Sequence, residues 1–268
     1  MITDITLGQY FPIESAIHKI DPRAKILFTI VYIILVFLAD SPISYGFVAL
    51  FCISVILLSK IKFSVVIKSV KPMLFVILIT AIINVFFTGG KDILWSYKLI
   101  KITKLGVTNA VNMALRLIFL VVGSSLLTYT TSPIMLTDGI ERLLKPFSKI
   151  GVPAHEIAMM MTIALRFIPT LLEETQKIMT AQKSRGADFE SGNVIKRAKA
   201  LIPVLIPLFI NAFKRADELA TAMECRCYRG GEGRTRLRVL KFGKIDLLAL
   251  IIMLVFSALL ITFGILNI

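Results

Sequence analysis

The run LGVTNAVNMALRLIFLVVGSSLLTYT, from Leu105 to Thr130, decides the fold class. It is apolar over most of its length and contains a single charged residue, Arg116. An α-helix rises about 1.5 Å per residue, so a run of this length can cross the ~30 Å hydrocarbon core of a bilayer. The run therefore predicts a transmembrane helix.

The composition of the whole chain agrees with a membrane location. Of its 268 residues, 56% are hydrophobic and 18% are charged, whereas a soluble domain averages about 45–50% apolar and about 25% charged residues. The net charge of +14 would indicate nucleic-acid binding in a soluble protein. In a membrane protein, Lys and Arg gather on the cytoplasmic side and near anionic lipid. We therefore predict a membrane protein that does not bind nucleic acid.

Further apolar blocks on both sides predict an all-α, polytopic membrane protein with about five transmembrane helices. Asp21-Pro22 opens the first helix, because Asp can cap a helix and Pro fits its first turn. An odd number of spans leaves the N-terminus cytoplasmic and the C-terminus extracellular. The predicted spans are 26–39, 43–59, 73–88, 105–130 and 245–266. They define an N-terminal region of four spans (1–131), a cytoplasmic or interfacial region (132–244) and a C-terminal span (245–268).

The segment from Lys91 to Lys104 alternates apolar and charged residues. Alternation is typical of a strand, so the segment is interpreted as a small hairpin at the membrane interface. Counting the spans places it outside the cell, although its four lysines are more usual on the cytoplasmic side.

Arg116 shares one helix face with Asn109 and Asn112, because the spacing is i, i+3 and i+7. A charge inside a span normally faces other helices or water. We interpret Arg116 as hydrogen-bonded within the bundle, or reaching the interface, rather than as a transport residue. This interpretation assumes that no predicted span contains an acidic residue that could pair with Arg116.

Two predicted helices between residues 132 and 244 resemble each other. One covers about 154–183 and ends at Gly186, and the other covers about 193–227. Both have prolines upstream and a polar half downstream, and Thr180-Ala181-Gln182-Lys183-Ser184-Arg185 aligns with Thr221-Ala222-Met223-Glu224-Cys225-Arg226. Each copy ends in an arginine triplet, Ser184-Arg185-Gly186 or Cys225-Arg226-Cys227. A positive charge at a helix C-terminus is also favourable in water, so the spacing alone does not distinguish solvated arginines from docking groups.

The apolar faces of these two helices are large for a region exposed to water. Both runs contain proline or lie close to charged residues, so helices lying in the membrane interface fit them better than spans do. Methionine-rich surface adapts to partners, although packing of the two helices on each other is the alternative. The candidate partner-binding residues are Met159, Met160, Ile163, Leu205, Leu208 and Phe209.

The chain shows no sequence pattern of an enzyme. It has no G-x-x-x-x-G-K-[ST] loop, no H-E-x-x-H and no G-x-S-x-G, so we predict no catalytic residue. No metal site is predicted, because the cysteines and the two histidines lack the spacing of metal ligands. The acid pairs Glu173-Glu174 and Asp217-Glu218 are expected to be solvated or paired with Lys177, Lys214 and Arg215. Any powered transport would then draw on a partner.

Four motifs together resemble the transmembrane coupling subunits (T components) of energy-coupling factor transporters, importers of the ATP-binding cassette superfamily. The resemblance covers nearly the full length. Its motifs are Asp21-Pro22-Arg23-Ala24-Lys25, Ala164-Leu165-Arg166-Phe167-Ile168-Pro169, Ala181-Gln182-Lys183-Ser184-Arg185-Gly186 and Ala222-Met223-Glu224-Cys225-Arg226-Cys227-Tyr228.

The resemblance implies a non-catalytic role. In that family the two arginine triplets end crossed coupling helices and dock in two ATPase subunits, which bind ATP and Mg. The apolar faces of the helices hold an interchangeable substrate-binding membrane subunit (S component) for vitamins or other micronutrients. Here, both triplets depart from the usual Ala-Arg-Gly, and Cys227 puts the second turn in question because Gly is more permissive than Cys. A self-contained secondary transporter and a membrane scaffold remain the alternatives.

Overall fold

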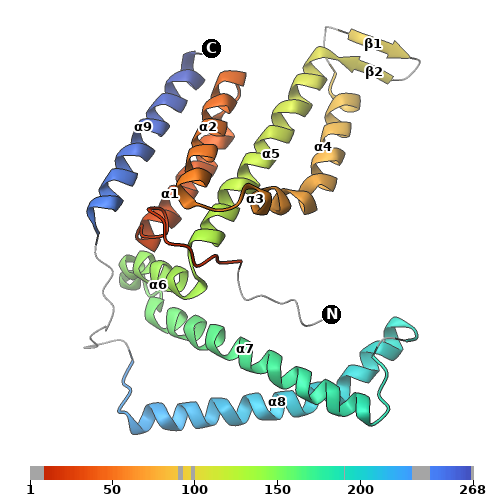
Figure 1. The fold of residues 1–268 in the computed structure, drawn as a ribbon, viewed down its shortest axis with the longest axis vertical. Coiled ribbons are helices and arrows are strands. Elements are labelled where there is room, and N and C mark those ends of the chain that lie inside the picture. Colours follow the sequence, from red (N-terminus) through yellow and green to blue (C-terminus); the bar gives the residue numbers. More distant parts are fainter. Residues whose placement is uncertain (1–8, 90–92, 98–99, 190, 231–241, 267–268) are drawn as a thin grey trace. The chain divides into compact units, whose positions relative to one another are not determined.

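The computed structural model describes residues 9–89, 93–97, 100–189, 191–230 and 242–266, and Figure 1 shows their arrangement within each part of the chain. Contacts divide the chain into two units. The bundle unit comprises residues 8–139 and 238–268, and the crossed-helix unit contains residues 140–237. The sequence predicted these divisions after residues 131 and 244.

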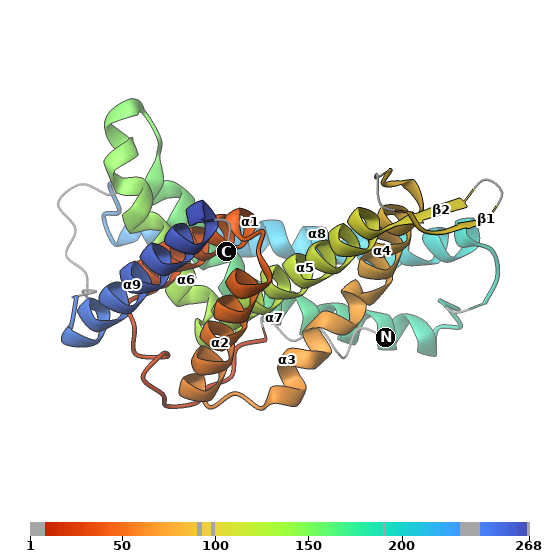
Figure 2. The same ribbon diagram turned by 90° about the horizontal axis from the view of Figure 1, so that it is seen from above.

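The bundle unit is built from apolar helices, which confirms the predicted all-α, multi-pass membrane fold. Its α5 packs against α1, α2, α3 and α4, and α9 packs against α1 and α2. Figures 1 and 2 both show α4 beside α5. The helices are α1 (Pro22–Leu38), α2 (Pro42–Ser59), α3 (Phe63–Val70), the short 3-10 helix η1 (Lys71–Met73), α4 (Leu74–Phe87), α5 (Lys104–Thr130) and α9 (Lys244–Leu266).

Five helical segments among the described residues are long and apolar enough to cross a membrane. Four of them correspond to predicted spans: Pro42–Ser59, Phe63–Phe87, Lys104–Thr130 and Lys244–Phe263. The fifth is Ala154–Ser184, which the sequence analysis placed at the interface, and its mean hydropathy of 1.3 is the lowest of the five. The predicted span 26–39 corresponds to α1, an apolar helix of 17 residues.

A buried core joins α1, α2, α5 and α9. Tyr32, Val48 and Phe256 are among its members. The Tyr32 hydroxyl donates to the Phe119 carbonyl at 2.9 Å. Gly123 makes this approach possible, because a Cβ atom there would lie 2.1 Å from the Tyr32 ring. The outward faces of the same helices carry exposed apolar side chains, as expected for a surface in lipid.

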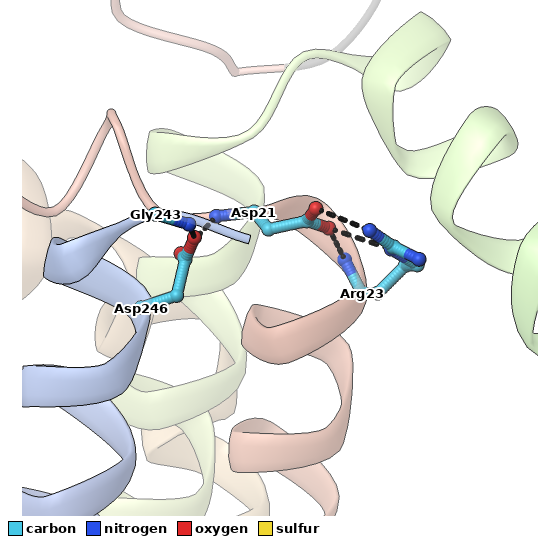
Figure 3. Close-up of polar contacts among 4 residues, drawn as sticks. All are labelled: Asp21, Arg23, Gly243 and Asp246. Atoms are coloured by element: carbon cyan, nitrogen blue, oxygen red, sulfur yellow. Dashed lines mark hydrogen bonds and ion pairs between the residues drawn. The ribbon is translucent and has the colours of Figure 1, made fainter. Parts of the chain in front are cut away.

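One carboxylate ties the start of α9 to the start of α1 (Figure 3). Asp246 accepts the backbone N–H of Asp21 at 2.7 Å and the backbone N–H of Gly243 at 2.7 Å. Asp21 caps α1 as predicted, accepting the Arg23 amide at 2.9 Å, and it also pairs with the Arg23 guanidinium at 2.8 Å. Arg116 binds Ala39 and Asp40 rather than an acid of a span, although Asp246 lies in the predicted span 245–266. Its carboxylate satisfies amides at the helix start.

The segment before α1 folds back onto the end of α5. The Phe11 amide donates to the Tyr129 carbonyl at 3.1 Å. His18 accepts the Ser15 hydroxyl at Nδ1, 2.7 Å away, and donates from Nε2 to the Phe11 carbonyl at 3.1 Å. Burial, with the nearby Lys25 ammonium, lowers the pKa of His18, which favours the neutral imidazole that this bonding pattern requires.

Arg116 is hydrogen-bonded within the bundle. Its Nη2 donates to the Ala39 carbonyl at 3.1 Å and to Asp40 Oδ1 at 2.8 Å. Both acceptors lie in the turn between α1 and α2, beyond the ends of those helices. The structure therefore supports the structural interpretation of Arg116 over a transport role.

The predicted hairpin is present between α4 and α5. Strand β1 (Ile93–Tyr97) pairs antiparallel with β2 (Ile100–Thr103). Thr103 then caps α5, accepting the Gly106 amide at 3.1 Å. Lys91 and Lys98 lie outside the described residues.

The crossed-helix unit contains two long helices. α7 (Ala154–Ser184) follows α6 (Pro133–Leu144), within which the division between units falls, and the 3-10 helix η2 (Lys145–Ile150). α8 (Val194–Cys225) follows a short loop. The predicted internal prolines lie at Pro169 in α7 and at Pro203 and Pro207 in α8, and both helices continue through them.

Candidate functional site

The first arginine triplet ends α7 in a Schellman turn. Arg185 is the C-cap residue, and Gly186 follows with a left-handed φ of 89°. The Gly186 amide donates to the Lys183 carbonyl at 3.0 Å, and the Ala187 amide donates to the Gln182 carbonyl at 3.0 Å. These two bonds satisfy carbonyls that a helix end otherwise leaves open. Arg185 itself is exposed.

The second triplet ends α8 in the same turn. Arg226 is the C-cap residue, and Cys227 has a left-handed φ of 55°. The Cys227 amide donates to the Glu224 carbonyl at 2.8 Å, and the Tyr228 amide donates to the Met223 carbonyl at 3.0 Å. The departure from glycine at Cys227 therefore leaves the turn intact, at the cost of a conformation that a residue with a Cβ atom disfavours.

Both arginines are available to a partner. Arg185 and Arg226 are exposed, and within the described part of the chain neither guanidinium has a hydrogen-bond or ion-pair partner. An arginine presents five N–H donors in a fixed fork that matches a carboxylate. Two such groups on stiff helix ends could each bind an acidic pocket.

The two helices contact each other at a polar crossing. Glu174 of α7 accepts the Asn211 side-chain amide of α8 and pairs with Arg215 of α8, whose Nη2 lies 3.3 Å from Glu174 Oε2. Both charged side chains are partly buried, with 18% of the Glu174 side chain and 33% of the Arg215 side chain exposed. The predicted pairing of these acids with neighbouring bases is thus confirmed for Glu174 and Arg215.

The crossing lies at equivalent positions of the internal repeat. Glu174 precedes Arg185 by 11 residues, and Arg215 precedes Arg226 by 11 residues. At about 1.5 Å per residue, each arginine end lies roughly 16 Å along its helix from the crossing. The sequence analysis aligned the two copies but did not identify this consequence.

Charge inversion between the copies could have indicated which residues meet. When the copies are aligned on their arginines, the four charged positions of α7 from Glu173 onward carry the opposite sign in α8. Equivalent positions face each other only at the crossing itself, where opposite charges attract and like charges would repel, and the structure shows this contact for Glu174 and Arg215. The pairs are Glu173 with Lys214, Glu174 with Arg215, Lys177 with Glu218 and Lys183 with Glu224.

The predicted apolar surface is only partly uncovered. Met160, Leu205 and Phe209 are exposed at 58%, 45% and 60%, whereas Met159, Ile163 and Leu208 are half-buried. The most exposed stripe on α8 follows the i, i+4, i+7, i+11 spacing of one helix face. It consists of Ile202, Ile206, Phe209 and Phe213, so the predicted set shares one member with it and missed Phe213, the most exposed at 73%.

Comparisons with known proteins identify the family. A family model described as cobalt transport protein (CbiQ) matches residues 14–237, which include both arginine ends and the crossing. The energy-coupling factor transporter transmembrane protein EcfT of Acidaminococcus fermentans is 58% identical over 260 residues, 97% of each chain. The chain therefore belongs to the family that the CbiQ model describes, together with this EcfT protein.

Other relatives carry the same description. The EcfT protein of Clostridium kluyveri is 58% identical over 250 residues, 93% of each chain. That of Listeria innocua is 48% identical over 260 residues, 97% of this chain and 98% of the relative. The chain is therefore a transmembrane energy-coupling subunit, one component of a multi-subunit transporter, and a multi-pass membrane protein.

Proposed function

We propose that this subunit transmits the ATP-driven motion of two partner ATPases to a substrate-binding membrane subunit. The proposal assigns ATP and Mg binding to the ATPases and no catalytic step to this chain. The transported compound is a vitamin or another micronutrient, selected by the substrate-binding subunit.

The observation that carries the proposal is the matched pair of arginine ends. Arg185 and Arg226 end two crossed helices in the same turn and lie at equal distances from the Glu174–Arg215 contact. Two equivalent ends suit two equivalent partners. A displacement of either end acts on the crossing through an unbroken helix, because α7 and α8 each continue without interruption to the C-cap arginine.

The apolar surface of α7 and α8 supports a second contact. Ile206, Phe209 and Met160 leave more than half of their surface uncovered, and exposed apolar patches of this kind mark interaction surfaces. We assign this surface to the substrate-binding subunit. Motion of the arginine ends would then reach that subunit directly, because the same two helices carry both surfaces.

The orientation follows from the charges. Lys and Arg are concentrated in residues 132–244, and positive residues favour the cytoplasmic side. We therefore propose that α7 and α8 lie at the cytoplasmic interface, with the N-terminus cytoplasmic and the C-terminus extracellular. The charged second half of α7, from Glu173 onward, favours an interfacial helix over a span.

The decisive experiment removes both arginines. The double variant Arg185→Ala/Arg226→Ala should lose its ATPase partners in a pull-down from detergent extracts and lose ATP-dependent uptake. The matched control is Arg197→Ala/Lys199→Ala, which also removes two exposed positive charges, both near the start of α8. Full assembly and uptake in the arginine double variant would contradict the proposal, as would an equal loss in the control.

A further inference from the structure

Three side chains connect the second arginine end to the start of α7. Tyr228, which follows the α8 turn, has its hydroxyl 3.4 Å from His155 Nε2. His155, the second residue of α7, has Nδ1 3.1 Å from Glu141 Oε1 in α6. All three residues belong to the crossed-helix unit, and the side chains of His155 and Glu141 are 29% and 12% exposed. The contacts are therefore partly shielded from water, which strengthens them relative to exposed pairs.

Tyr228 is tied to the arginine through the backbone. Its amide is the one that closes the Schellman turn around Arg226, donating to the Met223 carbonyl at 3.0 Å. A side chain anchored at Tyr228 thus fixes the residue whose backbone defines the end of α8. In the first copy the equivalent residue is Ala187, whose methyl side chain cannot form a hydrogen bond.

The Tyr228–His155 contact joins one pair of helix ends, and the chain itself joins the other pair. The end of α7 is joined to the start of α8 by residues 185–193. Glu174, Asn211 and Arg215 join the helices at the crossing. The Tyr228–His155 contact joins the start of α7 to the end of α8. Two helices joined at three places resist a change of crossing angle, whereas two places would leave the end of α8 free to swing.

We propose that Glu141, His155 and Tyr228 form a positioning network that holds Arg226 in the orientation required for docking. The network acts on the second arginine end and leaves the first to be positioned by its loop. The inference rests on the proposed docking role of the arginines, but the positioning itself is testable without a partner.

The partner-free test measures the distance between the two arginine ends. In a Cys52→Ser/Cys227→Gly background, nitroxide labels on Ser184→Cys and on the native Cys225 report this distance by double electron–electron resonance. The ends are separated by at most about 33 Å along the helices, within the range of the method. We expect one narrow distribution, which broadens at least about twofold in Tyr228→Phe and in His155→Ala. His155→Gln, whose amide can both donate and accept, should narrow it again. An unchanged width in both variants would overturn the proposal.

The partner test asks whether the network acts through Arg226 alone. Affinity for the co-purified ATPase subunits is compared in Arg185→Ala, which retains the second end, and in Arg226→Ala, which retains the first. Tyr228→Phe should weaken binding about threefold and His155→Ala about tenfold in the Arg185→Ala background. Neither should change it in the Arg226→Ala background. Equal effects in both backgrounds would indicate general destabilisation and refute the inference.

The two failures can be told apart. If removing both arginines leaves ATPase binding unchanged, the proposed docking role is wrong, yet the resonance experiment still decides whether the network positions the end of α8. If the arginines matter and the distance distribution does not respond to the network, the inference alone is wrong.

Discussion

Gly186 and Cys227 occupy the same position in two copies of one helix-ending turn. Both have a left-handed backbone, with φ of 89° and 55°, and both donate their amide to the carbonyl three residues earlier. The left-handed region costs a residue with a Cβ atom about 1–2 kcal/mol, a penalty that glycine avoids. The two arginine ends therefore share their geometry and differ in the cost of maintaining it.

This difference predicts the effect of exchanging the residue. Cys227→Gly should strengthen the second turn by roughly 0.5–1 kcal/mol, less than the full penalty because glycine also gains freedom in the unfolded chain. Gly186→Ala should weaken the first turn by about 1 kcal/mol. Hydrogen exchange of the Tyr228 and Ala187 amides measures both effects locally. Faster exchange at Tyr228 in Cys227→Gly would contradict the assigned turn.

The crossing contact predicts a charge-swap rescue. Glu174→Arg alone should place two cations at the crossing and lower stability by about 1–2 kcal/mol, since the pair is only partly shielded from solvent. Arg215→Glu alone should place two carboxylates at the crossing and lower stability by a similar amount. Glu174→Arg/Arg215→Glu restores opposite charges and should recover much of the loss in thermal stability and in ATP-dependent uptake. A double variant no better than its worse parent would show that the two side chains do not act as a pair.

The thiols report on which side of the membrane the second arginine end lies. Cys225 and Cys227 are exposed, whereas Cys52 is buried in the bundle core. A membrane-impermeant maleimide should label the chain in inside-out vesicles and leave it unlabelled in intact cells. Cys225→Ser/Cys227→Ser should abolish the labelling, because only Cys52 remains. Labelling of intact cells would reverse the proposed orientation.

Gly123 and Gly46 form a matched pair for testing the bundle core. A Cβ atom at Gly123 would lie 2.1 Å from the Tyr32 ring, whereas one at Gly46 meets nothing within 4 Å. Gly123→Ala should displace Tyr32, break its bond to the Phe119 carbonyl and cost about 1–3 kcal/mol. Gly46→Ala should be neutral or stabilising by up to about 1 kcal/mol, since alanine favours helix. Thermal unfolding in detergent compares them. Equal behaviour of the two variants would refute the assigned packing of α1 against α5.

Much of the architecture could be predicted because its signals are local. Uninterrupted apolar runs indicate spans wherever they occur, and Asp21-Pro22 indicates a helix start through a cap and a fixed φ. The arginine ends were likewise predictable, because Gly186 and the repeated motif fix where α7 and α8 stop. Charge inversion between Glu174 and Arg215 was also present in the sequence, although alignment of the copies alone does not show that those positions touch.

Other contacts could not be predicted, because they join segments far apart in the chain. The Asp21 amide and the Asp246 carboxylate are separated by 225 residues, and Tyr228 and His155 by 73. A buried amide needs an acceptor, but the sequence does not say which of many acids provides it. The partner of Arg116 could not be predicted either, because Asp40 lies in the turn between α1 and α2, 76 residues earlier in the chain.

The sequence by itself determined a helical membrane protein with two arginine-terminated helices in one region, because hydropathy and helix-ending residues act over a few turns. Tertiary structure alone decided that those helices cross at Glu174 and Arg215 and that Cys227 accepts the left-handed turn. It also decided that Tyr228 reaches His155. These outcomes depend on which side chains meet when the helices pack, and that choice is made by the three-dimensional balance of burial, charge and hydrogen bonding.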